Sequence, residues 1–200
     1  MPLRVFIDLD ITPTQRDVGN GALTSEVETG IAADPPPFVD GSLQALTGFC
    51  REHQIPVHLL GGSDGIIHHM FAMPGIRKAS DCGATECMSG GALILESPHC
   101  GAGCTECTWC RRNIMLSRSA DDEVIVYAGE GDSGRCPAQY ADIVFAKDRL
   151  QTFCQEKNIS YHLYNSFQDI VHRLQLSLGR KRLRKRLVAE HMRRAAYIAE

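Results

Sequence analysis

Short apolar runs alternate with longer amphipathic segments along this chain of 200 residues. The runs are apolar over nearly their whole length, which is typical of strands buried on both faces of a parallel sheet. They occupy residues 3–8, 55–60, 123–128 and 142–146. The short run at 160–163 predicts an edge strand, and the glycine-containing stretch from 77 to 97 predicts a small hairpin or meander.

Segments with apolar residues at helical spacing lie between these runs. They predict helices at 42–53, 111–117 and 148–157, and a long terminal helix from 167 onward. Strands that alternate with helices at this spacing indicate an α/β fold, a parallel sheet with helices on both faces. We therefore expect one domain over 1–200, with three special segments: a turn-rich insertion at 20–38, a cysteine-rich loop at 97–112 and a basic C-terminal helix at 167–200.

The net charge of −3 and the pI of about 6.2 are ordinary for a soluble cytoplasmic enzyme. They argue against a protein that binds nucleic acid through the charge of its whole surface. The charge is uneven, because residues 173–200 hold nine Lys and Arg against two Glu. Three interpretations of this segment remain open. It is a helix with a solvated basic face over a packed apolar stripe, a surface for self-association as a homodimer, or a contact for an acidic partner. We expect no removed leader and no membrane partner, since no apolar stretch has the roughly 18 to 20 residues that span a bilayer.

The first apolar run ends in two carboxylates, Asp8 and Asp10, within the sequence Asp-Leu-Asp-Ile-Thr. Open α/β sheets keep their ligand crevice at the carboxyl ends of the strands. Like charges this close raise each other's pKa, so the pair makes chemical sense when a cation or an incoming proton belongs to the site. The pattern favours metal-assisted phosphoryl transfer to an aspartate.

Four segments are expected to meet at this edge: the turn after Asp8, the tip at 61–63, the start of the helix at Arg111, and the turn after Gly129. Their order and content resemble the haloacid dehalogenase superfamily of phosphatases. The likeness is to the branch of phosphoserine phosphatase-like and diketo-methylthiopentane phosphate phosphatase-like enzymes. It rests on the residues from Asp8 to Asp17 and on the run 126–147, and it extends to about residue 172.

The resemblance implies a Rossmann-like three-layer fold and a phosphomonoester hydrolase. Asp8 would attack phosphorus to form an aspartyl-phosphate, and Asp10 would act as general acid and then as general base. Arg111 stands where the family usually has a lysine that neutralises the phosphate. Ser63 follows the glycines of the second motif and would contact the phosphate together with backbone N–H groups.

The same resemblance implies a magnesium ion at this edge. Its ligands would be the Asp8 carboxylate, the Asp10 backbone carbonyl and the fourth-motif Glu130, with Asp132 compensating for the longer Glu side chain. The family's cap is reduced here to 20–38, so we expect a phosphorylated small molecule, a bulkier phosphorylated substrate, or a site that a partner subunit covers.

Several motif positions depart from the family pattern. Leu60 precedes the glycine pair where the family has a serine, Ile11 replaces a glycine, Glu130 replaces an aspartate, and the second aspartate of the fourth motif is absent. The alternative function is therefore a catalytically degenerate protein that keeps the fold and binds a ligand or a partner, with zinc as a possible stabiliser.

Four of the nine cysteines crowd into eleven positions: Cys100, Cys104, Cys107 and Cys110. Four thiolates at such spacing suit tetrahedral zinc, and a chain without a secretory signal has less use for a disulfide framework. Structural zinc, reduced buried thiols and redox chemistry remain open for this cluster.

Overall fold

The computed structural model describes residues 2–9, 41–61, 76–78, 93–96, 111–180 and 183–199. Several predicted features lie outside these residues: Asp10, Ser63, the insertion at 20–38, and the four cysteines from Cys100 to Cys110. The predictions made for them stay predictions.

The described strands form a seven-stranded sheet in the order β3-β4-β2-β1-β5-β6-β7. The strands are β1 (Leu3–Leu9), β2 (Val57–Gly61), β3 (Ile76–Lys78), β4 (Leu93–Glu96), β5 (Val124–Gly129), β6 (Ile143–Ala146) and β7 (Tyr161–Leu163). Every pair of neighbours is parallel. β1 lies at the centre, where Val5 is in register with Val57 of β2 and with Val126 of β5.

The predicted α/β class and parallel sheet are confirmed, but the hairpin or meander predicted between 77 and 97 is wrong. β3 and β4 pair in parallel, with Ile76 opposite Leu93 and Lys78 opposite Leu95. A parallel pair needs a crossover connection of a dozen residues or more, and the segment 79–92 is long enough to supply one. Short apolar runs show only that strands exist; their direction depends on how the chain returns.

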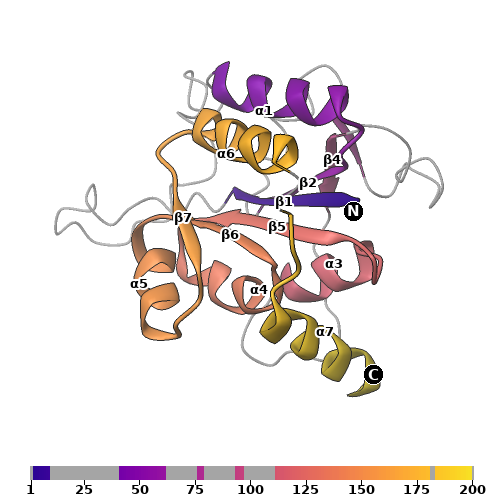
Figure 1. Ribbon diagram of the computed structural model, residues 1–200, viewed down its shortest axis with the longest axis vertical. Helices are drawn as coiled ribbons and strands as arrows, with labels where there is room; N and C mark the ends of the chain where they lie inside the picture. The colour runs from indigo at the N-terminus through magenta and orange to yellow at the C-terminus, as the bar shows by residue number, and fades with distance from the viewer. Residues whose placement is uncertain are drawn as a thin grey trace, which may run out of the picture.

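Helices cover both faces of the sheet (Figure 1). On one face lie α1 (Gly41–Glu52) and α6 (Phe167–Gly179); on the other lie α3 (Arg111–Arg118), α4 (Arg135–Tyr140), α5 (Asp148–Glu156) and α7 (Leu187–Ala199). Alternate residues of β1 point to opposite faces. Val5 and Ile7 join the core under α1 and α6, whereas Phe6 joins the core against α3, α4 and α5.

The single helix predicted over 167–200 is wrong, because α6 ends at Gly179 and α7 begins at Leu187. Residues 183–186 between them are not helical. The N–H of Arg186 donates to Oδ1 of Asp142 at 2.9 Å, and the guanidinium of Arg193 donates to the same oxygen at 3.0 Å. Asp142 is buried, so these bonds compensate its charge and direct the chain away from the axis of α6.

Candidate active site

Asp8 lies one residue from the carboxyl end of β1, the central strand. Its neighbours are β2 on one side, where Asp8 is in register with Leu60, and β5 on the other. After β1 the chain adds β2, β3 and β4 on one side of that strand. It then returns to add β5 on the other side of β1. Parallel sheets bind ligands at such a reversal of strand order, outside the carboxyl ends of the strands.

The Asp8 carboxylate is buried, with 6% of the residue exposed, and protein donors contact both of its oxygens. Nε of Arg111 donates to Oδ1 at 2.8 Å. The hydroxyl of Tyr127 donates to Oδ2 at 2.8 Å, and the hydroxyl of Ser133 donates to Oδ2 at 3.0 Å. The cation and the two hydroxyl donors compensate this buried carboxylate for the water that it loses on burial.

Arg111 reaches Asp8 because it is the first residue of α3, which begins at the same edge of the sheet. Arg111 is only 7% exposed, so solvent screens the Arg111–Asp8 ion pair little. The guanidinium therefore supplies a fixed positive charge at the end of β1.

Tyr127 comes from β5, every residue of which is buried. Burial, and next the negative charge of Asp8, raise the pKa of Tyr127 well above its ordinary value. The phenol thus keeps its proton near neutral pH, so it acts as a donor to Asp8.

Two glycines leave room for the Tyr127 hydroxyl. A Cβ placed on Gly129 would lie 3.0 Å from that oxygen, and a Cβ on Gly134 would also lie 3.0 Å from it. Contacts this short are rarely tolerated, so a larger residue at either position would push on the phenol or on its neighbours. The glycines of this segment therefore help to place the hydroxyl on Asp8.

Glu130 follows β5 directly and forms an ion pair with Lys147, with Oε2 and Nζ 2.6 Å apart. Both side chains are about one third exposed. Nζ of Lys147 also lies 5.3 Å from the centre of the Tyr164 ring. Burial, followed by the charges of Glu130, Asp8 and Asp148, raises the pKa of Tyr164, as expected if these carboxylates share one edge of the sheet.

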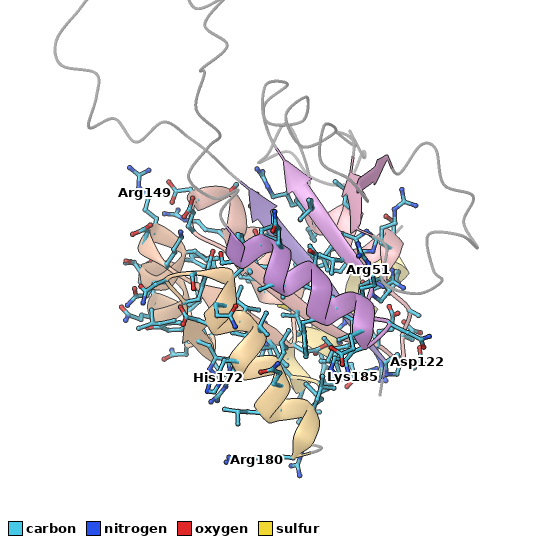
Figure 2. The ribbon with its side chains drawn as sticks, turned by 90° about the horizontal axis from the view of Figure 1, so that it is seen from above. Arg51, Asp122, Arg149, His172, Arg180 and Lys185 are labelled. Atoms are coloured by element: carbon cyan, nitrogen blue, oxygen red, sulfur yellow. The ribbon has the colours of Figure 1, made fainter. Side chains whose placement is uncertain are left out.

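Asp132 lies just beyond, in the short 3-10 helix η2 (Asp132–Gly134). Its carboxylate pairs with Arg135 at 2.7 Å and with Arg149 at 2.9 Å, and its side chain is nearly half exposed. Arg149 extends outward from the start of α5 (Figure 2). Asp132 is therefore engaged with surface arginines.

The described carboxylates do not fit a magnesium site as they stand. Both oxygens of Asp8 have protein donors, and Glu130 is paired with Lys147. Across the described ranges, no group of three or more His, Cys, Asp or Glu side chains could hold a metal ion. A divalent ion would have to displace Lys147 from Glu130, and the contribution predicted for Asp10 lies outside the described residues.

The structure brings Asp8 and Arg111 into contact, and sequence reasoning missed three residues around them: Tyr127, Ser133 and Lys147. One of them carried a signal. A tyrosine inside an otherwise apolar strand needs a partner for its hydroxyl when both faces are covered. Lys147 follows β6 and could be placed beside Glu130 only once β5 and β6 were known to be parallel neighbours.

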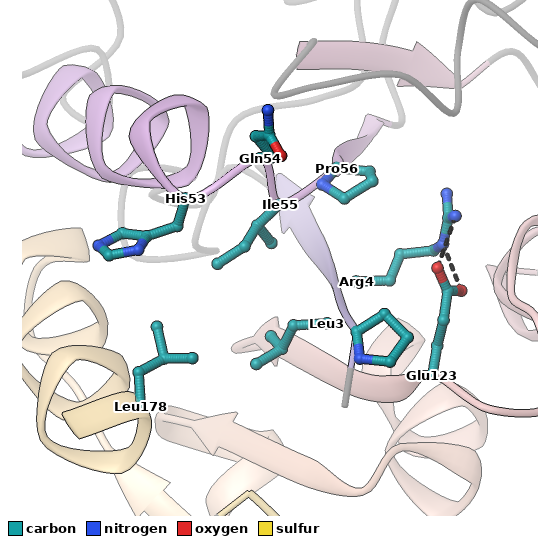
Figure 3. Close-up of a pocket in the computed structure, with 9 residues that line it drawn as sticks. Leu3, Arg4, His53, Gln54, Ile55, Pro56, Glu123 and Leu178 are labelled. Carbon is teal, nitrogen blue, oxygen red and sulfur yellow. Dashed lines mark hydrogen bonds and ion pairs between the residues drawn. The ribbon is translucent and has the colours of Figure 1, made fainter. Parts of the chain in front are cut away.

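A cavity of about 350 Å³ lies at the opposite edge, near the amino ends of β1 and β5 (Figure 3). Arg4 and Glu123 lie on its wall, joined by contacts of 2.7 Å and 2.8 Å. Nη1 of Arg4 also meets Nε2 of His58 at 2.9 Å. Because these charges satisfy one another and lie away from the carboxyl ends of the strands, we interpret the group as structural.

The chain is similar to curated proteins named 2-hydroxy-3-keto-5-methylthiopentenyl-1-phosphate phosphatase. One from Exiguobacterium sibiricum is 30% identical over 135 residues, which cover 66% of this chain and 61% of the relative. One from Bacillus cereus is 28% identical over 133 residues, covering 65% and 60%, and one from Bacillus mycoides is 27% identical over 126 residues, covering 62% and 57%. No family model matches.

The matched region spans about three fifths of the length of these curated relatives. The similarity thus connects the α/β fold described above with proteins that are named as phosphatases. In the described part of the chain, no helix is both long and apolar enough to cross a bilayer.

Proposed function

We propose that this chain hydrolyses phosphomonoesters and that Asp8 is the nucleophile. The observation that carries the proposal is the position of Asp8: a buried carboxylate near the carboxyl end of the central strand, 2.8 Å from a buried guanidinium. The similarity to named phosphatases supports the same conclusion.

The first step forms an aspartyl-phosphate. A lone pair of an Asp8 carboxylate oxygen forms a bond to phosphorus as the bond from phosphorus to the ester oxygen breaks, and the leaving oxygen takes up a proton. The negative charges of Asp8 and of the phosphate repel each other, so a nearby cation lowers the barrier. Arg111 supplies that charge from α3, with Lys147 close to the same edge.

The second step releases phosphate. Water attacks phosphorus and loses a proton, and the bond from phosphorus to Asp8 breaks with its electron pair returning to the carboxylate. Asp10 is the proposed source of the first proton and acceptor of the second. Ser63 is the proposed phosphate contact on the second motif. Both lie outside the described residues.

The proposed substrate is a phosphorylated small molecule or a bulkier phosphorylated group. The relatives are named for a methylthiopentenyl phosphate ester, which makes that ester the first natural substrate to assay. An aryl phosphate such as p-nitrophenyl phosphate tests the chemistry without any assumption about the alcohol.

The test is the rate of p-nitrophenol release by the wild-type chain, by Asp8→Asn and by the matched control Asp122→Asn. Asp122 is exposed on the turn before β5. Loss of the nucleophile should lower kcat on the order of 10⁵-fold, while the control should keep the wild-type rate. Phosphate incorporated into acid-quenched protein should disappear in Asp8→Asn.

Two results would contradict this function. One is a wild-type chain that neither releases p-nitrophenol nor incorporates phosphate at any magnesium concentration. The other is an Asp8→Asn variant that keeps the wild-type rate. The first result would support the alternative of a degenerate binding protein.

The metal predictions need separate measurements. Turnover measured with EDTA and after magnesium is restored tests the magnesium requirement. Elemental analysis of protein purified without chelators tests the cysteine cluster, for which we expect about one zinc ion per chain. Protein free of zinc would leave reduced or redox-active thiols at Cys100, Cys104, Cys107 and Cys110.

A further inference from the structure

The basic C-terminal segment uses several of its charges within the chain. Residues 183–199, which we call the C-terminal clamp, contain three basic side chains that donate to main-chain carbonyl oxygens: Lys185 to Asp121, Arg186 to Ala138 and Gln139, and Arg193 to Tyr140. The helix of the clamp, α7, lies on the far side of α3 and α4 from the sheet (Figure 1). The clamp is thus in a position to hold the ends of these two helices.

The arginines of the clamp complete the carbonyl end of α4. The last carbonyl groups of a helix have no partner within the helix. Nη2 of Arg186 lies 2.8 Å from the carbonyl oxygen of Ala138 and 2.7 Å from that of Gln139. The carbonyl oxygen of Tyr140, the last residue of α4, accepts a bond from Arg193. Positive charge at this end also suits the helix dipole, and a helix of six residues is too short to be stable through its own backbone bonds.

The other end of α4 leads directly into the candidate site. α4 begins at Arg135, immediately after η2 ends at Gly134. Within η2, the hydroxyl of Ser133 donates to Asp8 at 3.0 Å. Because a helix is a stiff element, its carbonyl end and the residues at its start move together. A contact that fixes the carbonyl end of α4 therefore also fixes Ser133.

The clamp reaches α3 in the same way. α3 begins at Arg111, which contacts Asp8, and ends at Arg118. The hydroxyl of Tyr197 donates at 2.9 Å to the carbonyl oxygen of Leu116, in the last turn of α3. α3 and α4 thus each extend from the surroundings of Asp8 to the clamp.

Stability alone does not account for an arginine at position 186. The residue is partly buried, and among the described residues its Nε has no hydrogen-bond partner. A buried N–H without a partner costs free energy, and apolar residues often replace buried charges without loss of stability. The bonds from Nη2 to the carbonyls of α4 are therefore the feature that explains this side chain.

We propose that Arg186 and Arg193 are positioning residues of the candidate site, which hold the carbonyl end of α4 and so keep Ser133 on Asp8. The consequence for turnover rests on the function proposed above, whereas the hold on α4 does not. The basic C-terminal segment thereby acquires a role within its own chain.

The first test is hydrogen exchange in Arg186→Met. This variant loses the two bonds to α4 and keeps the main-chain N–H that binds Asp142. Exchange of the amides in 135–141 should become about 10- to 100-fold faster, the effect of losing hydrogen bonds to a charged group. The amides of β5 should stay protected, which shows that the chain is still folded. Arg193 is left unchanged, because it also binds the buried Asp142.

Two variants serve as references for Arg186→Met. Arg186→Lys keeps a charged donor and should restore most of the protection of 135–141. Arg194→Met removes an exposed guanidinium of α7 that pairs with Glu190, and it should behave as wild type. Should Arg186→Met not fold, Arg186→Gln, which is shorter and uncharged, takes its place with the same expected direction.

The second test is a double-mutant cycle with Ser133→Ala, measured as kcat/KM for p-nitrophenyl phosphate. Arg186→Met should lower kcat/KM about 10-fold when Ser133 is present, because the hydroxyl is then less often on Asp8. In the Ser133→Ala background the same change should lower kcat/KM by less than about threefold. A merely structural loss would lower kcat/KM equally in both backgrounds.

Three results would overturn the inference. One is unchanged exchange of 135–141 in Arg186→Met. Another is a folded Arg186→Met variant with the kcat/KM of wild type, and the third is an equal loss with and without Ser133. A wild-type chain without turnover would remove the proposed function instead, and the exchange measurement would then decide by itself whether the clamp holds α4.

Discussion

Two buried arginine–carboxylate pairs lie at opposite ends of β1, and they are built differently. At the amino end, Arg4 contacts both oxygens of Glu123 through Nε and Nη2. At the carboxyl end, Arg111 contacts Oδ1 of Asp8, while Oδ2 meets two hydroxyls. In the first pair one guanidinium contacts both carboxylate oxygens, and Oε2 also accepts a hydrogen bond from the Ala120 N–H; in the second pair the guanidinium and the hydroxyls contact different oxygens.

This difference separates a structural ion pair from a site prepared for chemistry. A planar guanidinium that matches both oxygens gives the most rigid arrangement and leaves the carboxylate little freedom to react. Neutral donors on one oxygen fix the orientation of a carboxylate and still permit its charge to change during a reaction. The variants below test whether the two ends respond as this comparison requires.

The largest effect is expected at the amino end, on stability. Glu123→Gln leaves Arg4 buried without its counter-charge, and breaking a buried pair costs about 3 to 5 kcal/mol in free energy of unfolding. Urea denaturation measures this loss. The kcat of the folded variant should stay within about twofold of the wild-type value. The matched control Glu190→Gln breaks a partly exposed i,i+4 pair with Arg194 and should cost less than about 0.5 kcal/mol. A loss below 1 kcal/mol for Glu123→Gln would make the comparison wrong.

Exchange of each arginine for lysine sharpens the comparison. Arg4→Lys loses the two-point contact with Glu123 and should cost about 2 kcal/mol in unfolding free energy. Arg111→Lys keeps a point charge beside Asp8, so kcat/KM should stay within about tenfold of wild type. Urea denaturation and steady-state kinetics measure the two effects. The comparison would be wrong if Arg4→Lys were as stable as wild type while Arg111→Lys had no turnover. The planar guanidinium would then be needed at the carboxyl end of β1 and not at its amino end.

The Glu130–Lys147 pair tests the magnesium prediction. If magnesium binds Glu130, it competes with Lys147, so Lys147→Met should lower the magnesium concentration for half-maximal turnover about fivefold, equivalent to a partly exposed ion pair of about 1 kcal/mol. Lys157→Met, which removes an exposed lysine after α5, is the matched control. An unchanged half-saturation, or turnover that EDTA does not affect, would remove Glu130 from the list of magnesium ligands.

The smallest effect concerns acid stability. Burial acts to raise the pKa of Glu123, but hydrogen bonds from Arg4 and from the Ala120 N–H, with the charge of Arg4, hold that pKa below its ordinary value. The resulting stabilisation is complete above the unfolded pKa of about 4.3 and is lost as pH falls through the folded pKa. Unfolding free energies measured from pH 6 downward should therefore fall less steeply in Glu123→Gln than in wild type. Parallel curves would show that Glu123 does not contribute to this acid limb.

Much of the fold could be read from the apolar pattern. The runs predicted at 3–8 and 123–128 became β1 and β5, and the helix predicted at 42–53 became α1. Residues 3–8 of β1 and all of β5 are buried without a break, and α1 is buried on one face, so hydrophobic patterning specifies these elements. Helix α4 was not predicted, because it is short and contains Pro137 in a segment that reads as a turn.

The candidate site was only partly readable. Asp8 was singled out because paired carboxylates near the end of a buried strand have few structural explanations, and Arg111 because it stands where the resembled family usually has a lysine. Ser133 gave no comparable signal, and Tyr127 signalled only that its hydroxyl needs a partner, not which one. Their hydroxyls gain a meaning only when β5 lies beside β1 and η2 turns back over the strand ends.

The sequence by itself determined the main strands and helices and the carboxylate near the end of the first strand, because continuous burial of strands and one-sided burial of helices leave a pattern in neighbouring residues. Tertiary structure decided the parallel direction of β3 and β4, the break between α6 and α7, and the partners of each charged group. Those features depend on groups far apart in the chain: Asp142 captures Arg186 and Arg193, and Asp8 gathers Arg111, Tyr127 and Ser133. The partners of a buried charge depend on which donors the folded chain brings within reach, and the local sequence pattern does not show which donors these are.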